Sequence, residues 1–282
     1  MTCRIGLDVR VTTELSLQLA VSSTAGTLLE ESLDLEGATI SPVLTHPGPH
    51  GTRSQSLLAG TGPLTITYRA RVAAPRAEPD RPPRIEPLQV TPLPLHAPRF
   101  GAEELLYLRP SRYCPSDRLE GFAAAEFLRS QPTGDRPGAA AIATWIHDRI
   151  GYVLGSSNGH DTAEDTLITG QGACRDFAHL AVALSRAAGI PARYVAVYAP
   201  GLTPMDFHAA FEAWEEGTWW VHDPTRLAPR TSLVRIATGR DAADVAFLST
   251  LSGFTDLETI EVTATVGGTL PADDHVSPVR LP

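Results

Sequence analysis

Hydrophobic and polar residues alternate along three stretches of the first 110 residues. The alternation runs from Ile5 to Val11, repeats from Leu15 to Val21, and recurs from Leu64 to Val72. A period of two places one face of a strand in a core and leaves the other in water, as in antiparallel sheets. The pattern therefore predicts an amino-terminal, antiparallel β-sandwich-like domain.

A proline-rich stretch, Pro75 to Pro98, follows these strands and shows little periodicity. Proline lacks a backbone N–H and fixes φ, so this stretch suits neither a regular helix nor a central strand. We expect a stiff, extended connection between domains. The predicted division is an amino-terminal β domain with this connection, residues 1–110, and a second domain, residues 111–282.

The periodicity becomes helical in the second domain. Asp117 with Glu120 three residues later fits a capping box that opens a helix, and Pro137 begins another. A third helix carries apolar residues at i, i+3, i+4 and i+7 from Phe177, and ends at Gly189. We expect this third helix to pack its apolar stripe into a core.

Strands follow the third helix. They are predicted at Arg193 to Tyr198, Ala209 to Trp214 and Trp219 to His222, and alternation returns at Ile260 to Val266. A helix followed by antiparallel strands is an α+β arrangement. The predicted fold class is therefore α+β, with the amino-terminal β domain joined to a core of helix and antiparallel sheet.

The composition is that of an ordinary globular protein. The 282 residues are 43% apolar and 20% charged, close to the average for globular domains. No apolar run approaches the ~20 residues that a membrane span requires, and Met1 to Val11 lack the apolar centre of a signal peptide. We therefore expect a cytoplasmic protein without a membrane partner.

Charge and residue usage exclude several classes of function. The net charge is −9 and no basic block is present, which argues against a nucleic-acid partner. The sequence contains no lysine, so lysine Schiff-base chemistry and a P-loop lysine are excluded. Neither a Cys/His cluster nor a calcium loop of the Asp-x-Asp-x-Asp-Gly type is present, and we expect no metal and no cofactor.

Cys174 is the first residue that points to chemistry. It stands where the loop Gly170-Gln171-Gly172-Ala173 gives way to the third predicted helix. The two glycines allow a tight bend that presents the thiol at the start of the helix. The positive end of the helix dipole favours a thiolate, which is the reactive form of cysteine.

Two further residues complete a possible catalytic set. His208 begins an apolar stretch that follows the third helix, and a histidine there is able to take the thiol proton and later protonate a leaving amine. Asp223 closes the strand after it, at a spacing that suits an antiparallel hairpin. A carboxylate at that place is able to hold the imidazole and stabilise its charged form.

Four stretches together resemble the transglutaminase-like cysteine enzymes, which run Cys, His, Asp in chain order. They are GQGACRDFAHL (170–180), GIPARYVAVY (189–198), DFHAAFEAW (206–214) and WWVHDPT (219–225). The resemblance implies a papain-like core in which Cys174 is the nucleophile, His208 the base and acid, and Asp223 its orienting carboxylate. One departure is His208-Ala209-Ala210-Phe211, where many members read His-Ala-Trp.

Two more stretches extend the resemblance over nearly the whole chain. YLRPSRYC (107–114) and ATGRDAADV (237–245) are similar to a bacterial branch of the family that carries an amino-terminal β domain. The resemblance also implies an oxyanion hole, to which the backbone N–H of Cys174 contributes. Tyr152 occupies the region where the family supplies an aromatic donor. Gln171 is the rival, because papain-type enzymes use a glutamine.

The implied activity is a cysteine-nucleophile hydrolase, a protease or amidase that cleaves peptide or carboxamide bonds through a thioester acyl-enzyme. If an amine attacks the thioester in place of water, the protein is a transglutaminase; we favour hydrolysis because nothing identifies a second-substrate site. The expected partner is a peptide or protein substrate. Two other readings stay open, a non-catalytic peptide-binding protein on the same fold, and metal binding by Cys174, His208 and Asp223.

The neighbouring polar residues receive structural roles. His179 lies five residues after Cys174, which turns it about 140° from the thiol around the helix. His222 precedes Asp223 on a strand and should point to the other side. Asp176 is expected to complement the helix dipole and bond to local backbone, while Cys3 and Cys114 are expected to be inert.

Overall fold

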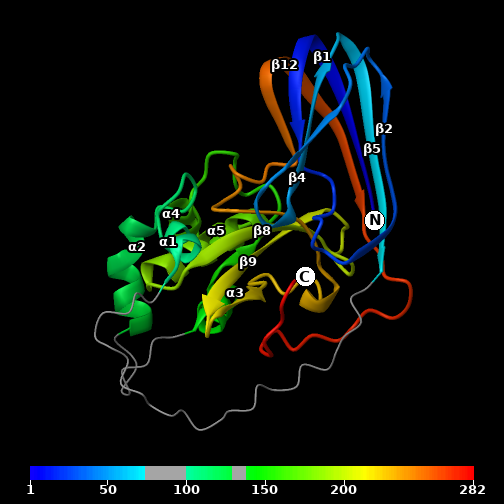
Figure 1. The fold of residues 1–282 in the computed structure, drawn as a ribbon. Coiled ribbons are helices and arrows are strands. Elements are labelled where there is room, and N and C mark those ends of the chain that lie inside the picture. The colour runs from blue at the N-terminus through cyan, green and yellow to red at the C-terminus, as the bar shows by residue number, and fades with distance from the viewer. Residues whose placement is uncertain (74–99, 129–137) are drawn as a thin grey trace.

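The amino-terminal strands form a curled antiparallel sheet (Figure 1). The structure is a computed structural model and describes residues 1–73, 100–128 and 138–282. Within these residues the sheet has the order β2-β5-β1-β4-β3, with β12 on the other edge of β1. The strands are β1 (Thr2–Leu17), β2 (Thr27–Gly37), β3 (Leu44–Pro47), β4 (Arg53–Ala59), β5 (Gly62–Ala73) and β12 (Leu248–Thr263).

Strand β1 gives the sheet its curl. Its first half, Thr2 to Val9, pairs with β5, and its second half, Thr13 to Leu17, pairs with β4. Register shifts against β12 between Val9 and Leu15 separate the two halves, and such bulges bend a strand. The alternation predicted one buried face correctly. The sandwich detail is not confirmed, because the described amino-terminal strands and β12 belong to one hydrogen-bonded sheet.

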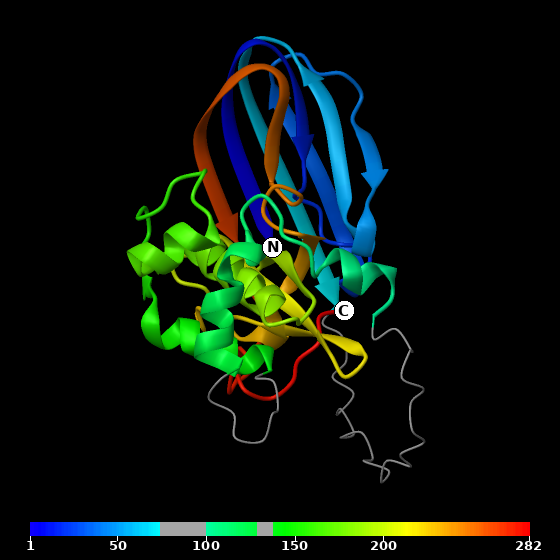
Figure 2. The same cartoon turned by 90° about the vertical axis from the view of Figure 1, so that its left-hand side faces the viewer.

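The last long strand of the chain returns to the first. β12 pairs with β1 along nearly its whole length, from Thr2 opposite Thr263 to Leu17 opposite Leu248, and Figure 2 shows the two strands side by side. The division at residues 110 and 111 stays a prediction. The pairing of β12 with β1 shows that Leu248–Thr263 lies in the amino-terminal sheet, although the sequence prediction assigned these residues to the second domain.

Helices gather on the other side of the molecule (Figure 1). They are α1 (Ala102–Leu106), α2 (Ser116–Ala123) with a π-helical turn (Ala124–Leu128), α3 (Ala139–Arg149), α4 (Ala163–Thr169) and α5 (Cys174–Ala187), with short 3₁₀ turns at Pro49–Gly51 and Arg230–Ser232. α2 begins after Pro115 without a side-chain cap, so the predicted Asp117–Glu120 box does not start it. No helix among these described segments is long and apolar enough to cross a membrane.

Two sequence predictions concern residues that are not described. The proline-rich connection from Pro75 to Pro98 lies outside the described residues, as does Pro137, where the second helix was expected to begin. The helix found after that point is α3, which starts at Ala139 and buries Ile142 and Ile146.

A second sheet supports α5. Among the described strands its order is β10-β9-β8-β11, all antiparallel; the bounds are β8 (Ala192–Tyr198), β9 (Phe207–Glu215), β10 (Thr218–His222) and β11 (Val234–Gly239). Phe177 and Leu180 of α5 belong to one buried apolar cluster with Phe211 of β9. The helix-then-strands prediction is therefore confirmed in this part of the chain. A two-stranded parallel pair, β6 (Gly151–Tyr152) and β7 (Gln171–Gly172), lies just before α5.

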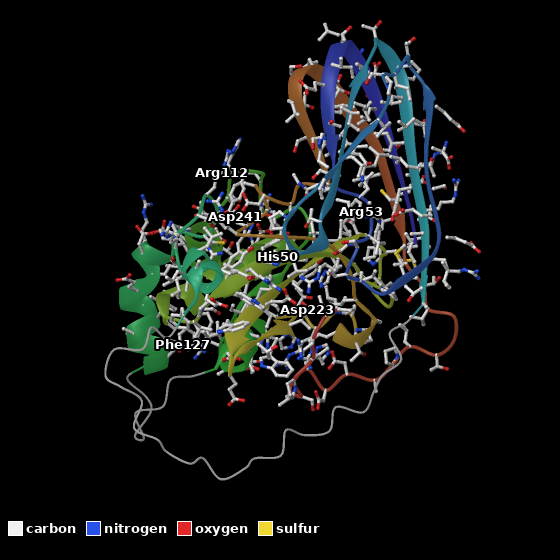
Figure 3. All side chains as sticks on the ribbon, viewed as in Figure 1. His50, Arg53, Arg112, Phe127, Asp223 and Asp241 are labelled. Carbon is white, nitrogen blue, oxygen red and sulfur yellow. The ribbon has the colours of Figure 1, made fainter. Side chains whose placement is uncertain are left out.

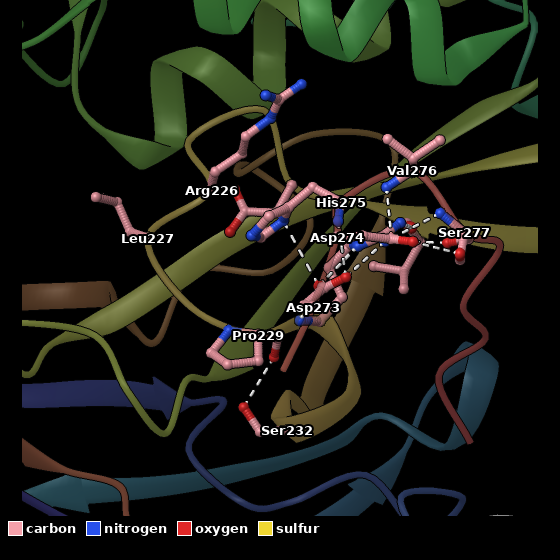
Figure 4. A network of polar contacts seen from close by, with 12 residues as sticks. Arg226, Leu227, Pro229, Ser232, Asp273, Asp274, His275, Val276 and Ser277 are labelled. Carbon is pink, nitrogen blue, oxygen red and sulfur yellow. Dashed lines mark hydrogen bonds and ion pairs between the residues drawn. The ribbon is translucent and has the colours of Figure 1, made fainter. Parts of the chain in front are cut away.

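The last residues, 264–282, run across the second sheet. Arg230 is buried and donates to both carboxylate oxygens of Asp273, at 2.9 and 2.8 Å. The N–H of Val221 in β10 donates to the carbonyl of Val279 at 2.8 Å. Figure 4 shows this polar network, with Asp273 and its neighbours beside Pro229.

A buried ionic network lies within the second sheet and reaches toward the amino-terminal strands. Glu212 of β9 accepts hydrogen bonds from Arg193 at 2.7 Å and from Arg235 at 2.7 and 2.9 Å. Arg193 also reaches His50, at 3.2 Å, and Glu103, at 2.9 Å. Figure 3 shows His50 where the amino-terminal strands meet the second sheet. The network therefore contacts the amino-terminal part of the chain through His50, which lies in the 3₁₀ turn between β3 and β4.

Candidate active site

Cys174 is the first residue of α5, as the sequence predicted, and it is partly exposed. Asp176, two residues later, accepts a hydrogen bond from the N–H of Ala173 at 2.8 Å. This contact caps the helix start, because the first N–H groups of a helix lack partners within it. Gly172 is required beside it, since an added Cβ would lie 2.6 Å from the Cβ of Asp176.

The loop before α4 is tied to the same helix start. Ser157 donates to Asp176, and Arg175 donates to the carbonyl of Asn158 at 2.5 Å. Arg175 also pairs with Asp176 at 2.8 Å. These bonds hold the loop against the first turn of α5, while Cys174 itself keeps its exposed side.

His208 and Asp223 meet in the interior. Nε2 of His208 lies 2.8 Å from Oδ2 of Asp223, and both side chains are fully buried. The other carboxylate oxygen of Asp223 accepts from the N–H of Thr225 at 2.9 Å and from its hydroxyl at 2.7 Å. Asp223 is thus held by three hydrogen bonds and presents one oxygen to the imidazole.

Opposing effects set the protonation of this pair. Burial alone would lower the pKa of His208, but the charge and hydrogen bond of Asp223, together with the neighbouring Cys174 thiol, raise it to about 10. Burial alone would raise the pKa of Asp223, yet His208 and Thr225 lower it. The pair therefore favours an imidazolium beside a carboxylate.

The second ring nitrogen of His208 is left for the thiol. Nδ1 is buried and forms no hydrogen bond with any described group. The Cys174 side chain still acts on the pKa of this imidazole by charge and by a hydrogen-bond contribution. Nδ1 is thus the ring nitrogen that Asp223 leaves available to the thiol.

Tyr152 lies beside the nucleophile, and Gln171 does not share its contacts. Tyr152 is opposite Gly172 in the parallel pair, and its ring contacts Phe177 with centroids 5.8 Å apart. Burial and then the charge of Cys174 raise the pKa of Tyr152 to about 12, while a hydrogen bond with the Cys174 backbone lowers it. Gln171 is exposed. Both oxyanion assignments stay predictions, and the position of Tyr152 is the better suited.

The two histidines close to the proposed catalytic residues in sequence, His179 and His222, are packed in the core. His179 is fully buried, accepts from the N–H of Ala242 at 3.1 Å, and stacks on Tyr113. Burial lowers its pKa to about 3. His222 stacks on Phe211, and burial lowers its pKa to about 4. Neither ring is in contact with the His208–Asp223 pair through any described hydrogen bond.

The two remaining cysteines are also buried. Cys3 lies in β1 and Cys114 precedes α2, and burial is the main cause that raises the pKa of each thiol to about 12. A thiol with so high a pKa is mostly protonated at neutral pH, which disfavours nucleophilic reaction.

Thr225 and Asp206 enter the site without having been singled out in the sequence. Thr225 belongs to the quoted stretch WWVHDPT, so a turn in which its hydroxyl bonds back to Asp223 was a possible signal. Asp206 precedes β9 by one residue, and its charge contributes to raising the pKa of Tyr152. In the sequence, only the closeness of Asp206 to His208 pointed to a place near the site.

Metal binding is not favoured by the geometry. Within the described part of the chain, no group of three or more His, Cys, Asp or Glu side chains is arranged to hold a metal ion. Cys174, His208 and Asp223 therefore do not form a ligand set.

Comparison with known proteins agrees with this arrangement. Residues 123–224 match the model of the transglutaminase-like superfamily, and this range contains Cys174, His208 and Asp223. A solved structure, a candidate cysteine protease from Cytophaga hutchinsonii, is 32% identical, with a TM-score of 0.79, over 98% of this chain and 94% of that one. This chain belongs to the transglutaminase-like superfamily. The structural match spans the amino-terminal sheet as well as the core.

Curated relatives of this transglutaminase-like protein occur in mycobacteria. An uncharacterized protein from Mycobacterium leprae is 32% identical over 165 residues, which are 54% of this chain and 58% of that protein. An uncharacterized protein from Mycobacterium tuberculosis is 32% identical over 146 residues, 46% of each. The chain thus spans about half the length of the curated relatives it matches.

Proposed function

We propose that this protein is a cysteine hydrolase that cleaves peptide or carboxamide bonds. The observation that carries the proposal is the buried His208–Asp223 pair, which leaves Nδ1 of His208 free beside a partly exposed cysteine at a helix start. The solved relative described as a candidate cysteine protease supports the same reaction class.

The proposed reaction proceeds in two stages. The thiolate of Cys174 attacks the carbonyl carbon, a C–S bond forms, and the C–N bond breaks as His208 gives its proton to the leaving amine. Water then attacks the thioester and gives a proton to His208. The C–S bond breaks and releases a carboxylic acid, and the thiolate–imidazolium pair is restored.

The developing oxyanion requires donors near the nucleophile. The N–H of Cys174 lies at the start of α5, where such groups bind negative charge, and it donates toward the Tyr152 hydroxyl oxygen. The Tyr152 hydroxyl is the proposed second donor, because its high pKa keeps it protonated at neutral pH. Asp223 does not take the proton; it holds His208 and stabilises the imidazolium.

Intact-protein mass spectrometry during turnover of a peptide mixture tests the proposal. We expect an acyl adduct on Cys174 that decays in water, no adduct in Cys174→Ala, and an undiminished adduct in Cys114→Ala, which removes a buried thiol elsewhere. If the adduct decays only when an amine is added, acyl transfer replaces hydrolysis as the function.

The absence of any adduct, with Cys174 no more reactive than Cys114 toward an alkylating agent, would reject catalysis in favour of a peptide-binding role. A peptide or protein substrate and a cytoplasmic location remain proposals of the same kind.

A further inference from the structure

The short strand β6 has one free edge beside the nucleophile. Gly151 donates to the carbonyl of Gly170 at 2.8 Å, and Val153 donates to the carbonyl of Gly172 at 2.9 Å. Residues 151 and 153 therefore point their N–H groups toward β7. In a parallel pair the residue between them points its N–H and C=O the other way. Tyr152 thus presents both backbone groups to the edge opposite β7.

Nothing among the described strands occupies that edge. β6 and β7 form a two-stranded pair with no third described strand, and both residues of β6 are exposed. Tyr152 faces Gly172 across the pair, and Cys174 follows only two residues later. An unpaired strand edge is a template for another extended chain, and this one lies next to the reactive thiol.

Two exposed apolar side chains follow the edge in sequence. Val153 is 43% exposed and Leu154 is 61% exposed, although large apolar side chains are usually covered. They lie in the turn after β6, in which the N–H of Ser156 donates to the carbonyl of Val153 at 3.4 Å. An extended ligand paired with Tyr152 would place its own side chains against them.

The charges near the edge restrict the ligand further. Besides burial, the Cys174 thiol and the carboxylates of Asp206 and Asp223 act together on the Tyr152 hydroxyl. The carboxylate of Asp206 is in an exposed residue and takes part in no ion pair among the described residues. An acidic ligand would meet repulsion here, whereas a neutral or basic one would not.

We propose that an extended peptide segment, neutral or basic, adds to the free edge of β6 through Tyr152 and thereby delivers its carbonyl to Cys174. This is strand addition, in which main-chain hydrogen bonds give affinity and side-chain contacts give selectivity. The proposal rests on the function proposed above and narrows its substrate from any carboxamide to an extended peptide.

Covalent labelling by vinyl sulfones separates the two proposals. In a randomised library of tetrapeptidyl vinyl sulfones and in the small reagent methyl vinyl sulfone, the Cys174 sulfur adds to the alkene carbon β to the sulfone. The carbanion formed at the α carbon then takes a proton. The labelling rate of the small reagent depends on the reactivity of the thiol alone. The labelling rate of the peptides depends on their binding to the protein as well. We expect the neutral and lysine-containing peptides to label Cys174 at least about tenfold faster than methyl vinyl sulfone does. Glutamate-containing peptides should label Cys174 more slowly than the neutral and lysine-containing ones.

Replacing one peptide N–H by an ester oxygen locates the backbone contact. We expect the replacement at one position to slow labelling about three- to tenfold, as loss of one hydrogen bond predicts, and replacements elsewhere to have little effect. Peptides that label no faster than methyl vinyl sulfone, or that tolerate the ester at every position, overturn the strand-addition proposal. If methyl vinyl sulfone itself does not prefer Cys174 over Cys114, the proposed function fails instead.

A matched pair of variants tests the protein side. Leu154→Asp should slow the peptide library several-fold and leave labelling by methyl vinyl sulfone unchanged. Leu44→Asp is the control, because Leu44 is similarly exposed, at 58%, on β3 of the amino-terminal sheet. Equal effects of the two substitutions on the peptide library would contradict docking at β6.

Discussion

At the residue scale, the state of the site depends on how firmly Asp223 is held. One of its oxygens faces His208, and the other accepts two hydrogen bonds from Thr225. The hydroxyl of Thr225 is therefore part of the support for the imidazolium, although it touches neither the thiol nor a substrate. Thr225 is best described as a positioning residue.

Removing that hydroxyl should weaken catalysis without abolishing it. In Thr225→Val the backbone N–H still bonds to Asp223, but one hydrogen bond to a charged group, about 1.5–3 kcal/mol, is lost. We expect roughly a tenfold lower acylation rate and an acid limb of the pH–rate profile shifted to higher pH. Thr225→Ser should restore both. A fall in thermal midpoint with an unchanged pH profile would indicate a purely structural role.

The His208–Asp223 pair also predicts how stability depends on pH. The raised pKa of His208 means that the folded state keeps a proton between about pH 6.5, its unfolded pKa, and about 10. Stability from this group is full below pH 6.5 and is lost as the pH rises toward 10. The lowered pKa of Asp223 gives stability above about pH 4 that is lost on acidification.

Asp223→Asn should therefore flatten the alkaline part of the stability curve. We expect the wild-type protein to exceed this variant most between about pH 4 and 6.5, with the difference shrinking toward pH 10. Thermal unfolding over this range provides the measurement. A difference that stays constant with pH would show that the charged pair does not form.

At the element scale, the start of α5 depends on one close approach. Gly172 of β7 touches the side chain of Asp176, which in turn caps the helix and binds Ser157. The position of Cys174 is thus set by the strand before the helix as much as by the helix itself.

Gly172→Ala should disturb this arrangement. Its Cβ would lie 2.6 Å from the Cβ of Asp176, and overpacking of this kind costs about 1–3 kcal/mol. We expect a lower thermal midpoint and slower alkylation of Cys174. Gly159→Ala in the nearby loop is the control, because a Cβ there meets nothing within 4 Å. Similar losses in both variants would refute the argument from crowding.

The helix and strands around the site were predictable because their signals are local. The stripe from Phe177 to Leu184 and the apolar stretch that begins at His208 each lie within a few residues. The motifs also ordered the three proposed reactive groups along the chain. β2 was not predicted: most of its residues are exposed, and only Leu33 and Leu35 alternate toward the core, which is too short a pattern to mark a strand. The capping pattern at Asp117 was present in sequence, yet the helix begins one residue earlier, after Pro115.

At the scale of the whole molecule, a buried ionic network lies in the second sheet and reaches His50 of the amino-terminal part. Glu212 is buried between two guanidinium groups, those of Arg193 and Arg235, and these two residues lower its pKa although burial opposes them. Sequence alone did not indicate this network, because its members come from β8, β9 and β11 and face one another only after the sheet has formed.

Neutralising the central carboxylate should be costly. In Glu212→Gln two buried cations lose their partner, and breaking a buried ion pair typically costs about 3–5 kcal/mol. Urea denaturation should show that loss. Glu30→Gln provides the comparison, since Glu30 pairs with Arg71 at 2.6 Å on the surface, where both side chains are about two-thirds exposed and such pairs contribute about 0–1 kcal/mol. Comparable effects would contradict a stabilising role for the network.

The return of β12 to β1 has a consequence for biosynthesis. Thr2 pairs with Arg69 of β5 on one edge and with Thr263 on the other. The second edge of β1 therefore stays uncovered until β12, which begins only at Leu248, has been translated. Such distant pairing slows folding and exposes an edge to other nascent chains. Cutting the polypeptide between the two segments should thus yield halves that find each other in trans, or that aggregate when apart.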